Sequence, residues 1–271
     1  MTNSATPAIR GRGMAVAYGE TLALAASDVE MPAGQVTAVI GPNGSGKTTL
    51  LNAVSGLLPL SAGSLEVLGE PPAASGRRVA YVLQATRVNE YLPITVLEAV
   101  RMGRYAHRGL TGRFTAADHD AVRDAMELLQ ITDLARRHLG ALSGGQRQRV
   151  FVAQGLAQDA PIVLLDEPTT ALDVVSRDRI AAAIRTARDR GGTVVLTTHD
   201  LEEARTADWV VVVAGRVVAA GPPADVCRPD VLEPAYGARF IETDRGSVLF
   251  DDAHHRAMTQ RDADLGRRSS P

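Results

Sequence analysis

A short glycine-rich segment of the sequence has the residue types needed to grip the phosphates of a nucleotide. It reads Gly41-Pro-Asn-Gly-Ser-Gly-Lys-Thr48 and matches the pattern G-x-x-x-x-G-K-[ST]. Its glycines let backbone N–H groups approach phosphate oxygens, and the start of a following helix adds partial positive charge. The Lys47 ammonium can reach the β- and γ-phosphates, and the Thr48 hydroxyl can bind Mg²⁺. We therefore expect ATP to bind here, in contact with Gly41, Pro42, Asn43, Gly44, Ser45, Gly46, Lys47, Thr48 and Thr49.

Two acidic residues follow an apolar run later in the chain and could act on the same phosphates. The run is Ile162-Val-Leu-Leu165, and Asp166 and Glu167 come directly after it. A buried strand that ends in a carboxylate would bring Asp166 near the glycine-rich loop, where it can hold Mg²⁺ through water. Glu167 would then be placed to polarise an attacking water molecule. Because strands often end in Asp, this run predicts a metal site only together with the loop upstream.

A second segment with adjacent glycines reads Leu142-Ser-Gly-Gly-Gln146 and precedes a helix that we expect to begin near Arg147. Ser143 is a natural helix N-cap, and Gly144 and Gly145 would present backbone donors to an anion. One nucleotide has only one triphosphate, so this site would serve an ATP molecule held by another copy of the chain or by a homologue. A glycine-rich helix cap without a ligand is the alternative that this segment alone leaves open.

The elements expected around these segments predict an α/β fold. Apolar runs at residues 162–165 and 194–198, with a helix expected at 177–190 between them, are typical of a parallel sheet that is covered on both faces. A third run, residues 36–40, leads into the glycine-rich loop and a helix at 47–57. The remaining expected elements are antiparallel strands within 16–29, strands at 64–68 and 79–83, helices between about 94 and 139 including 117–129, and a terminal hairpin formed by 210–213 and 217–219.

The composition of the 271-residue chain is that of a soluble globular protein, with 45% hydrophobic and 22% charged residues. The net charge of −2 gives no reason to expect nucleic acid as a partner. The single cysteine, Cys227, allows no disulfide within this sequence and fits a reducing compartment. The most apolar run, residues 209–220, is interrupted by Gly215 and Arg216 and is too short to span a bilayer. Residues 251–271 have little apolar content, so we expect that tail to be largely disordered.

These motifs, in this order, resemble those of the ABC-type ATPases, and the resemblance extends from about Gly13 to Val226. It implies a P-loop NTPase core with a mainly parallel sheet, an N-terminal antiparallel β subdomain and a helical insert. We expect this nucleotide-binding domain to occupy residues 8–245, with the insert at about 86–150 and a largely disordered tail at 246–271. In this family two nucleotide-binding domains close head to tail, so the family's signature segment would contact the ATP of the partner subunit. The signature residues here are Leu142, Ser143, Gly144, Gly145 and Gln146.

The resemblance also implies roles for four residues outside the motifs above. Tyr18 would stack on adenine, and Asp173 would link the two active sites of the dimer. Gln84 would sense Mg²⁺ and face a membrane partner, whereas His199 would contact the γ-phosphate and order Glu167. Without the family, Tyr18 would be an ordinary core or surface residue and His199 a polar group at the end of a strand. The implied catalytic residues are Glu167, His199 and Gln84, and the implied Mg²⁺ ligands are Thr48, Gln84 and Asp166.

The segment Met102-Gly-Arg-Tyr-Ala-His107 resembles one found in ATPases of bacterial importers for metal ions, chiefly zinc and manganese, and for iron chelates or cobalamin. An exposed, positively charged helix end is the alternative interpretation of these residues. The resemblance implies an ATP-hydrolysing subunit that works as a homodimer or in a pair of nucleotide subunits and energises an importer of a metal ion or metal chelate. Its other partners would be a multi-span membrane permease and an extracytoplasmic substrate-binding protein, so it would be peripheral at the cytoplasmic face of the cell membrane. The nucleotide subunit of an exporter and a soluble ABC-type ATPase of cofactor assembly remain as alternatives.

Overall fold

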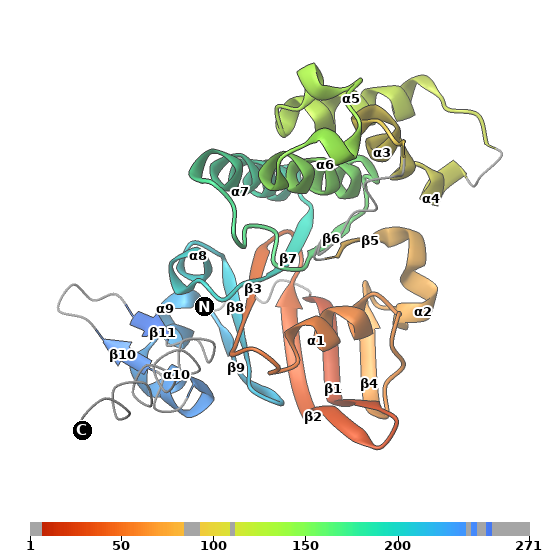
Figure 1. The fold of residues 1–271 in the computed structure, drawn as a ribbon. Coiled ribbons are helices and arrows are strands. Elements are labelled where there is room, and N and C mark those ends of the chain that lie inside the picture. Colours follow the sequence, from red (N-terminus) through yellow and green to blue (C-terminus); the bar gives the residue numbers. More distant parts are fainter. Residues whose placement is uncertain (1–6, 84–92, 109–111, 237–239, 243–247, 251–271) are drawn as a thin grey trace, which may run out of the picture.

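A six-stranded sheet runs through the centre of the computed structural model (Figure 1). The structure describes residues 7–83, 93–108, 112–236, 240–242 and 248–250. In spatial order the strands are β5 (Val79–Val82), β6 (Ile162–Leu165), β7 (Thr193–Thr197), β3 (Val36–Ile40), β8 (Trp209–Val213) and β9 (Val217–Gly221). The first five are parallel, and β9 runs antiparallel to β8. The predicted parallel sheet and its terminal hairpin are therefore confirmed.

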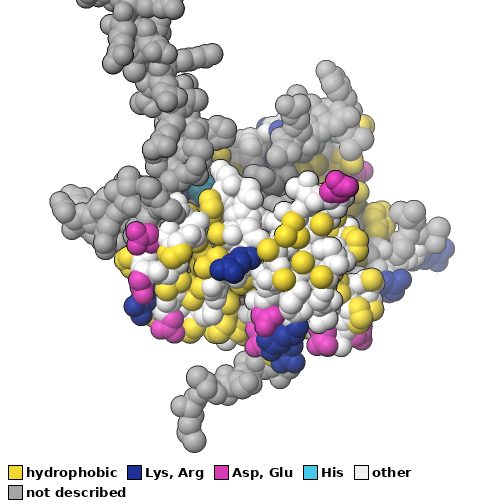
Figure 2. Space-filling view, turned by 90° about the horizontal axis from the view of Figure 1, so that it is seen from below, with side chains coloured by type: hydrophobic (Ala, Val, Ile, Leu, Met, Phe, Trp, Pro, Cys, Tyr) yellow, Lys and Arg dark blue, Asp and Glu magenta, His cyan; other side chains and the backbone are white. Residues whose placement is uncertain are grey.

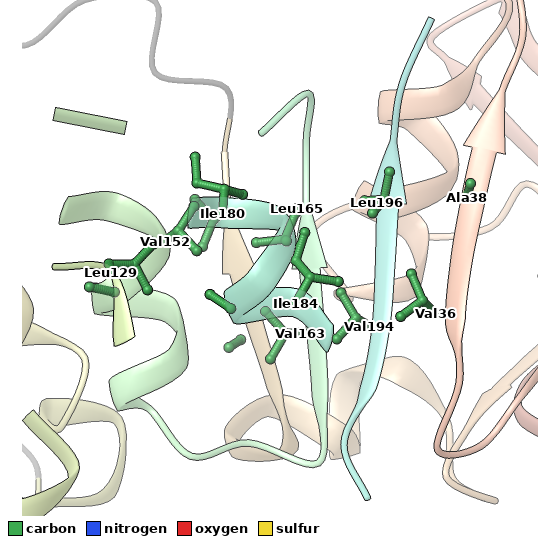
Figure 3. Packing of buried hydrophobic residues seen from close by; sticks show 14 of the residues in the cluster. Val36, Ala38, Leu129, Val152, Val163, Leu165, Ile180, Ile184, Val194 and Leu196 are labelled. Atoms are coloured by element: carbon green, nitrogen blue, oxygen red, sulfur yellow. The ribbon is translucent and has the colours of Figure 1, made fainter. Parts of the chain in front are cut away.

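Both faces of this sheet are covered, and neighbouring residues of each strand point to opposite faces. On one face Leu165 packs in a cluster with Ile184 of a covering helix (Figure 3). On the other face Leu164 belongs to a second cluster that includes Leu51. Each buried leucine side chain contributes about 1.5–3 kcal/mol, so the alternation fixes the sheet between two layers. The first layer is formed by α5 (Ala116–Leu128), α6 (Gly144–Ala157) and α7 (Val174–Asp189), and the second includes α1 (Lys47–Val54).

An antiparallel sheet with the strand order β2-β1-β4 completes the second layer. Its strands are β1 (Pro7–Tyr18), β2 (Thr21–Pro32) and β4 (Ala62–Val67). The sequence predicts antiparallel strands only within residues 16–29, so β1 begins well before the expected start. The pairing of β1 with β2 shifts register between Gly11 and Met14, and Gly13 has a φ of 52°. This irregularity breaks the apolar–polar alternation that would have revealed the first half of β1.

The antiparallel sheet carries exposed ion pairs. The guanidinium groups of Arg10 and Arg12 lie 3.2 and 2.7 Å from the carboxylate of Glu30. Seen from below, acidic and basic side chains lie near one another around the margin of the molecule, and hydrophobic side chains are spread over the middle (Figure 2). An exposed pair contributes only about 0.2–1 kcal/mol. The apolar clusters therefore stabilise this part of the fold more than its surface charges do.

A helical insert lies between β5 and β6 along the chain and packs on the sheet through α6 (Figure 1). It contains α3 (Val96–Met102), α4 (Tyr105–Arg108), α5, α6 and the 3₁₀ turns Thr132–Leu134 and Leu139–Ala141. The other short elements are α2 (Pro72–Ser75), the 3₁₀ turn Gly76–Arg78, α8 (Leu201–Arg205), α9 (Pro223–Val226) and α10 (Pro229–Tyr236). Among the described helices, none has the length and apolar character needed to cross a membrane.

Capping residues set helix ends that differ from the expected ones. The helix predicted at residues 47–57 ends at Val54, and Gly56 follows with a φ of 77° that turns the chain away. The helix predicted before β7 starts earlier than expected, at Val174, because the side chain of Asp173 caps its N-terminus. The two helix ends are therefore set by the residues beside them, Gly56 and Asp173, and not by the apolar pattern.

A hairpin of β10 (Phe240–Glu242) and β11 (Val248–Phe250) lies near the C-terminal end. The sequence predicts residues 246–271 to be largely disordered, but residues 248–250 form a strand. Three consecutive apolar residues with high strand propensity favour it there. Residues 251–271 lie outside the described part of the chain, so the expectation for them stays a prediction.

A buried carboxylate ties α4 to the rest of the insert. Asp118 of α5 is fully buried and accepts hydrogen bonds from Arg104 at 2.8 Å and from Arg108 at 2.7 Å. The backbone and hydroxyl of Thr115 donate to the same carboxylate at 2.8 and 2.7 Å. Hydrogen bonds from Thr115 and the two arginines hold the pKa of Asp118 below its usual range, despite its burial. The carboxylate therefore stays charged and paired at neutral pH.

The segment 102–107 contacts the C-terminal end of α6. A Cβ on Gly103 would lie 2.2 Å from the carbonyl oxygen of Gln154, so only glycine fits this approach. Arg104 donates to the carbonyl of Gln158 at 3.2 Å, and His107 Nε2 lies 2.6 Å from the same oxygen. Arg104 is buried and does not fit the interpretation of an exposed basic helix end, whereas Met102 and Tyr105 of the same segment are exposed. Its residues hold the insert together.

Replacing Asp118 with alanine is expected to destabilise the protein because it leaves the buried Arg104 without its charge partner. We expect the Tm to fall by roughly 6 °C or more. Asp120→Ala is the matched control, since Asp120 lies on the same helix in an exposed pair with Arg123. Thermal unfolding followed by circular dichroism measures both variants. Equal Tm values for the two variants would contradict the role of Asp118.

Candidate functional site

Three adjacent parallel strands bring the predicted site segments to one edge of the sheet. The strands β6, β7 and β3 are neighbours in that order. The glycine-rich loop follows β3, the pair Asp166 and Glu167 follows β6, and His199 follows β7. Since parallel strands all end at the same edge, these loops gather there, as is typical of ligand sites in open α/β sheets. The expected strand, loop and helix context of residues 41–48 is present.

The glycine-rich loop has a backbone that side chains would obstruct. Gly41 has a φ of 154°, and a Cβ on it would lie 2.0 Å from the carbonyl oxygen of Val213. Gly46, with a φ of 104°, is the N-cap of α1; its carbonyl accepts the N–H of Leu50 at 2.9 Å, and no side chain caps the first N–H groups of the helix. The N–H groups at the start of α1 are therefore available for an anion such as phosphate.

The ammonium of Lys47 lies inside this loop. Its Nζ donates to the carbonyl oxygens of Gly41 at 2.8 Å and Pro42 at 3.2 Å. Burial lowers the pKa of Lys47, and the nearby carboxylates of Glu167 and Asp166 partly counteract that shift. The Lys47 ammonium can exchange these two carbonyl contacts for phosphate oxygens with little change in the surrounding structure. This placement agrees with the predicted contact to phosphate.

Hydroxyl groups connect the helix α1 with the acidic pair after β6. Thr48 Oγ1 donates to Asp166 Oδ2 at 3.0 Å, and Thr197 Oγ1 donates to Asp166 Oδ1 at 2.6 Å. The Thr197 hydroxyl in turn accepts the N–H of Glu167 at 2.8 Å. One threonine at the end of β7 thus orients both acidic residues at the end of β6. Sequence reasoning missed Thr197, although it stands only two positions before His199.

The oxygen atoms of Thr48 and Asp166 fit a magnesium ion. Mg²⁺ prefers hard oxygen ligands and in phosphate sites takes only one or two from the protein, with water and phosphate supplying the rest. Within the described residues, no group of three or more His, Cys, Asp or Glu side chains could hold a metal by itself. The donor set therefore suits a nucleotide-bound Mg²⁺ better than a metal site formed by the protein alone.

The backbone at Glu167 is strained. Its φ of 48° lies in the left-handed region, which costs a residue with a Cβ about 1–3 kcal/mol and persists only where neighbouring contacts impose it. The N–H bond to Thr197 is one such contact. His199, after β7, is exposed. Gln84 lies outside the described residues, so its predicted place in the site is not described.

The signature segment lies against α7. Ser143 caps α6: its Oγ accepts the N–H of Gln146 at 3.2 Å, and the Gln146 side chain accepts the N–H of Ser143 at 3.1 Å. This reciprocal cap starts the helix at Gly144, three positions before the expected Arg147. Residues 142–146 lead into α6, which lies in the layer on one face of the sheet, whereas residues 41–49 lead into α1, which lies in the layer on the other face. The two segments thus begin helices on opposite faces of the sheet.

Gly145 couples the signature segment to Asp173. A Cβ on Gly145 would lie 2.5 Å from both Asp173 Oδ2 and the hydroxyl of Ser176. Asp173 caps α7 by accepting the N–H of Ser176 at 2.8 Å, and hydrogen bonds from Ser176 lower the pKa of Asp173. Asp173 is also exposed, as is Val174 beside it. Gly145, which is buried, therefore lies against Asp173, whereas Ser143, Gly144 and Asp173 are exposed to solvent.

Three tyrosines surround the site. Tyr18, at the end of β1, is 48% exposed, which leaves its ring accessible to a base. Tyr81 of β5 has a buried hydroxyl without a hydrogen-bond partner among the described residues, and its pKa is raised by burial and by Asp166. The buried hydroxyl of Tyr236 is hydrogen-bonded to the backbone of Gly41. The sequence gives no local signal for the last two, because their contacts come from distant segments.

Residues 24–170 match the protein-family model described as ABC transporter. The zinc transport system ATP-binding protein TroB of Treponema pallidum is 37% identical over 237 residues, which cover 87% of this chain and 89% of that protein. The ferric enterobactin transport ATP-binding protein FepC of Escherichia coli is 38% identical, with the same coverage of 87% and 89%. The manganese transport system ATP-binding protein MntB of Listeria monocytogenes is 35% identical and covers 83% of this chain and 95% of its own length.

Solved structures share the fold. A metal-chelate type ABC transporter in an inward-facing conformation superposes with a TM-score of 0.76 at 24% identity, covering 91% of this chain and 97% of the other. An ATP-binding cassette bound to ADP and phosphate in a dimeric post-hydrolysis state superposes with a TM-score of 0.70 at 25% identity, covering 79% and 98%. The P-loop NTPase core, antiparallel subdomain and helical insert are thus the architecture of a known class of ATPase domains.

Thr197→Val keeps the shape of the side chain but leaves the N–H of Glu167 without its acceptor and removes a donor to Asp166. Misplacing these groups is expected to lower kcat for ATP hydrolysis by about tenfold or more. Steady-state phosphate release measures the rate. Thr186→Val is the control, because the Thr186 hydroxyl donates to the carbonyl of Ala182 within its own helix α7, away from the acidic pair. A wild-type rate for Thr197→Val would show that the hydroxyl does not orient the acidic pair.

Proposed function

Because this chain belongs to the ABC transporter family, as an ATP-binding and ATP-hydrolysing transporter subunit, we propose that it energises an importer of a metal ion or metal chelate. The observation that carries this proposal is the group of relatives named for zinc, manganese and ferric enterobactin transport, which are 35–38% identical over at least 83% of this chain. The architecture of the insert around residues 102–107 agrees with it.

Within the site, the proposed roles of the glycine-rich loop, Thr48 and Asp166 rest on the contacts described above. Residues 41–49 hold the phosphates, with the Lys47 ammonium and the start of α1 supplying positive charge. Thr48 and Asp166, together with Gln84, provide oxygen ligands for Mg²⁺, which when bound would neutralise charge on the β- and γ-phosphates. Glu167 accepts the proton of the attacking water as general base.

Two further side chains complete the proposed site. His199 contacts the γ-phosphate from the loop after β7, where it is exposed to a ligand. Tyr18 stacks on adenine with its exposed ring. These groups position and stabilise a phosphoryl group during transfer, which is the main demand of this reaction on a protein.

We further propose that two nucleotide subunits pair head to tail, so that residues 142–146 of one contact the ATP held by the other. The separation of the signature segment from the glycine-rich loop within one subunit supports this pairing. Asp173 would link the two sites through its contact with Gly145. The nucleotide-binding domain would span residues 8–245 and sit at the cytoplasmic face of the membrane beside a multi-span permease. An extracytoplasmic substrate-binding protein would deliver the cargo.

An affinity pull-down tests the importer proposal. The tagged full chain is recovered from detergent-solubilised native membranes, with an untagged strain as control, and the co-purifying proteins are identified. We expect a multi-span permease together with an extracytoplasmic metal- or chelate-binding protein. Recovery of a permease without any binding protein would favour an exporter. If only soluble partners were recovered while another transporter stayed intact, the membrane role would be wrong and a role in cofactor assembly would replace it.

Glu167→Gln tests the proposed general base. The amide keeps the shape of the side chain but cannot accept the proton, so hydrolysis is expected to fall by about 100-fold or more. ATP would still bind, and the closed dimer would accumulate in light-scattering measurements with ATP and Mg²⁺. Glu127→Gln on the exposed side of α5 is the control and should behave as wild type. A Glu167→Gln variant that stays monomeric and hydrolyses ATP at the normal rate would contradict this role.

A further inference from the structure

Two loops of the site come from different parts of the chain yet must keep a fixed separation. Glu167 and Thr169 follow β6, and Thr198 and His199 follow the neighbouring β7. The hydroxyl of Thr197 joins the strands at their ends, but it contacts only Asp166 and the N–H of Glu167 and does not reach Thr169 or His199. The parts of both loops that extend beyond the sheet edge therefore require another connection.

One carboxylate on α8 provides that connection. Thr169 Oγ1 lies 3.0 Å from both oxygens of Glu203 and donates to them. The side chain of Thr198 lies close enough to the Glu203 carboxylate to lower its pKa as well. Thr198 Oγ1 accepts the N–H of Asp200 at 3.0 Å, so its own proton is available for the Glu203 carboxylate. Glu203 thus joins hydroxyls from the two loops on either side of Glu167 and His199.

The position of Glu203 is itself fixed. Asp200 caps α8 and accepts the N–H groups of Glu202 and Glu203 at 2.9 and 3.3 Å. The carboxylate is partly buried, and burial raises the pKa of Glu203, whereas its bonds to the two threonines act in the opposite direction. A partly buried carboxylate is costly unless it is hydrogen-bonded. The hydrogen bonding of the Glu203 carboxylate offsets this cost.

The link through Glu203 supports the loop in which the strained backbone of Glu167 lies. The left-handed φ of 48° at Glu167 needs support on both sides. The N–H of Glu167 is held by Thr197, and two residues later Thr169 is held by Glu203. Loss of the second support would let the loop relax and move the Glu167 side chain, while the glycine-rich loop would keep its own contacts.

We propose that Glu203 is a positioning residue for ATP hydrolysis, which fixes Glu167 relative to His199 through Thr169 and Thr198. The proposal rests on the roles of Glu167 and His199 in the proposed function. Glu203 is not among the residues proposed to hold the nucleotide or Mg²⁺, so its loss is expected to act on the chemical step and not on nucleotide binding.

The test compares Glu203→Ala, Glu203→Gln and the control Glu202→Ala by steady-state ATP hydrolysis of the full chain. Glu202 is the matched control because it lies next to Glu203 on α8 but its side chain is exposed and pairs with Arg205 at the surface. We expect Glu203→Ala to lower kcat by about tenfold or more, with the KM for ATP changed less than about twofold. Glu203→Gln retains an acceptor and a donor for the two threonines and should restore most of kcat.

A double-mutant cycle with Thr169→Val sharpens the result. If both residues act through one link, the double variant Thr169→Val/Glu203→Ala has nearly the kcat of Glu203→Ala alone. Additive losses, an unchanged kcat in Glu203→Ala, or equal losses in kcat and nucleotide affinity would overturn the proposal. If the wild-type chain itself hydrolysed no ATP, or if Glu167→Gln remained active, the proposed function would fail first. A normal Glu203→Ala beside an inactive Glu167→Gln would overturn only the role of Glu203.

Discussion

The site depends on the side-by-side, parallel arrangement of β6, β7 and β3. All three strands are buried throughout and mainly apolar, which suits a parallel sheet covered on both faces. That arrangement brings a phosphate loop, an acidic pair and a histidine to one edge, although the loop precedes the acidic pair by more than a hundred residues along the chain. Loops can then vary locally without moving the site as a whole.

Within this frame, threonine hydroxyls do most of the local positioning. A hydroxyl can accept one hydrogen bond and donate another, so a single side chain can orient two charged groups. Thr197 joins the N–H of Glu167 to the carboxylate of Asp166, and Thr169 joins the following turn to α8. The negative charge of this network lies near Lys47, whose pKa is lowered by burial. Charges of opposite sign thus face each other across the place where phosphate would bind.

The site residues that could be located from the sequence are those that belong to short sequence patterns. The glycine-rich loop, the acidic pair and the signature cap each form a short pattern, and the apolar runs beside them define the strands. Glu203 and Tyr236 could not be found this way, because their partners Thr169 and Gly41 lie far away in the sequence and only the fold brings them together. The early start of β1 was hidden for a different reason, since the register shift near Gly13 interrupts the alternating pattern.

The segment 102–107 shows how a family-specific sequence can mark architecture and not cargo. Its glycine allows close contact with α6, and Arg104 and His107 are engaged with carbonyl and carboxylate oxygens of the same subunit. The His107 ring lies 2.6 Å from the backbone oxygen of Gln158, and this contact fixes the ring within the insert. Residues 102–107 therefore act in this chain as packing residues that join α4 to the C-terminal end of α6.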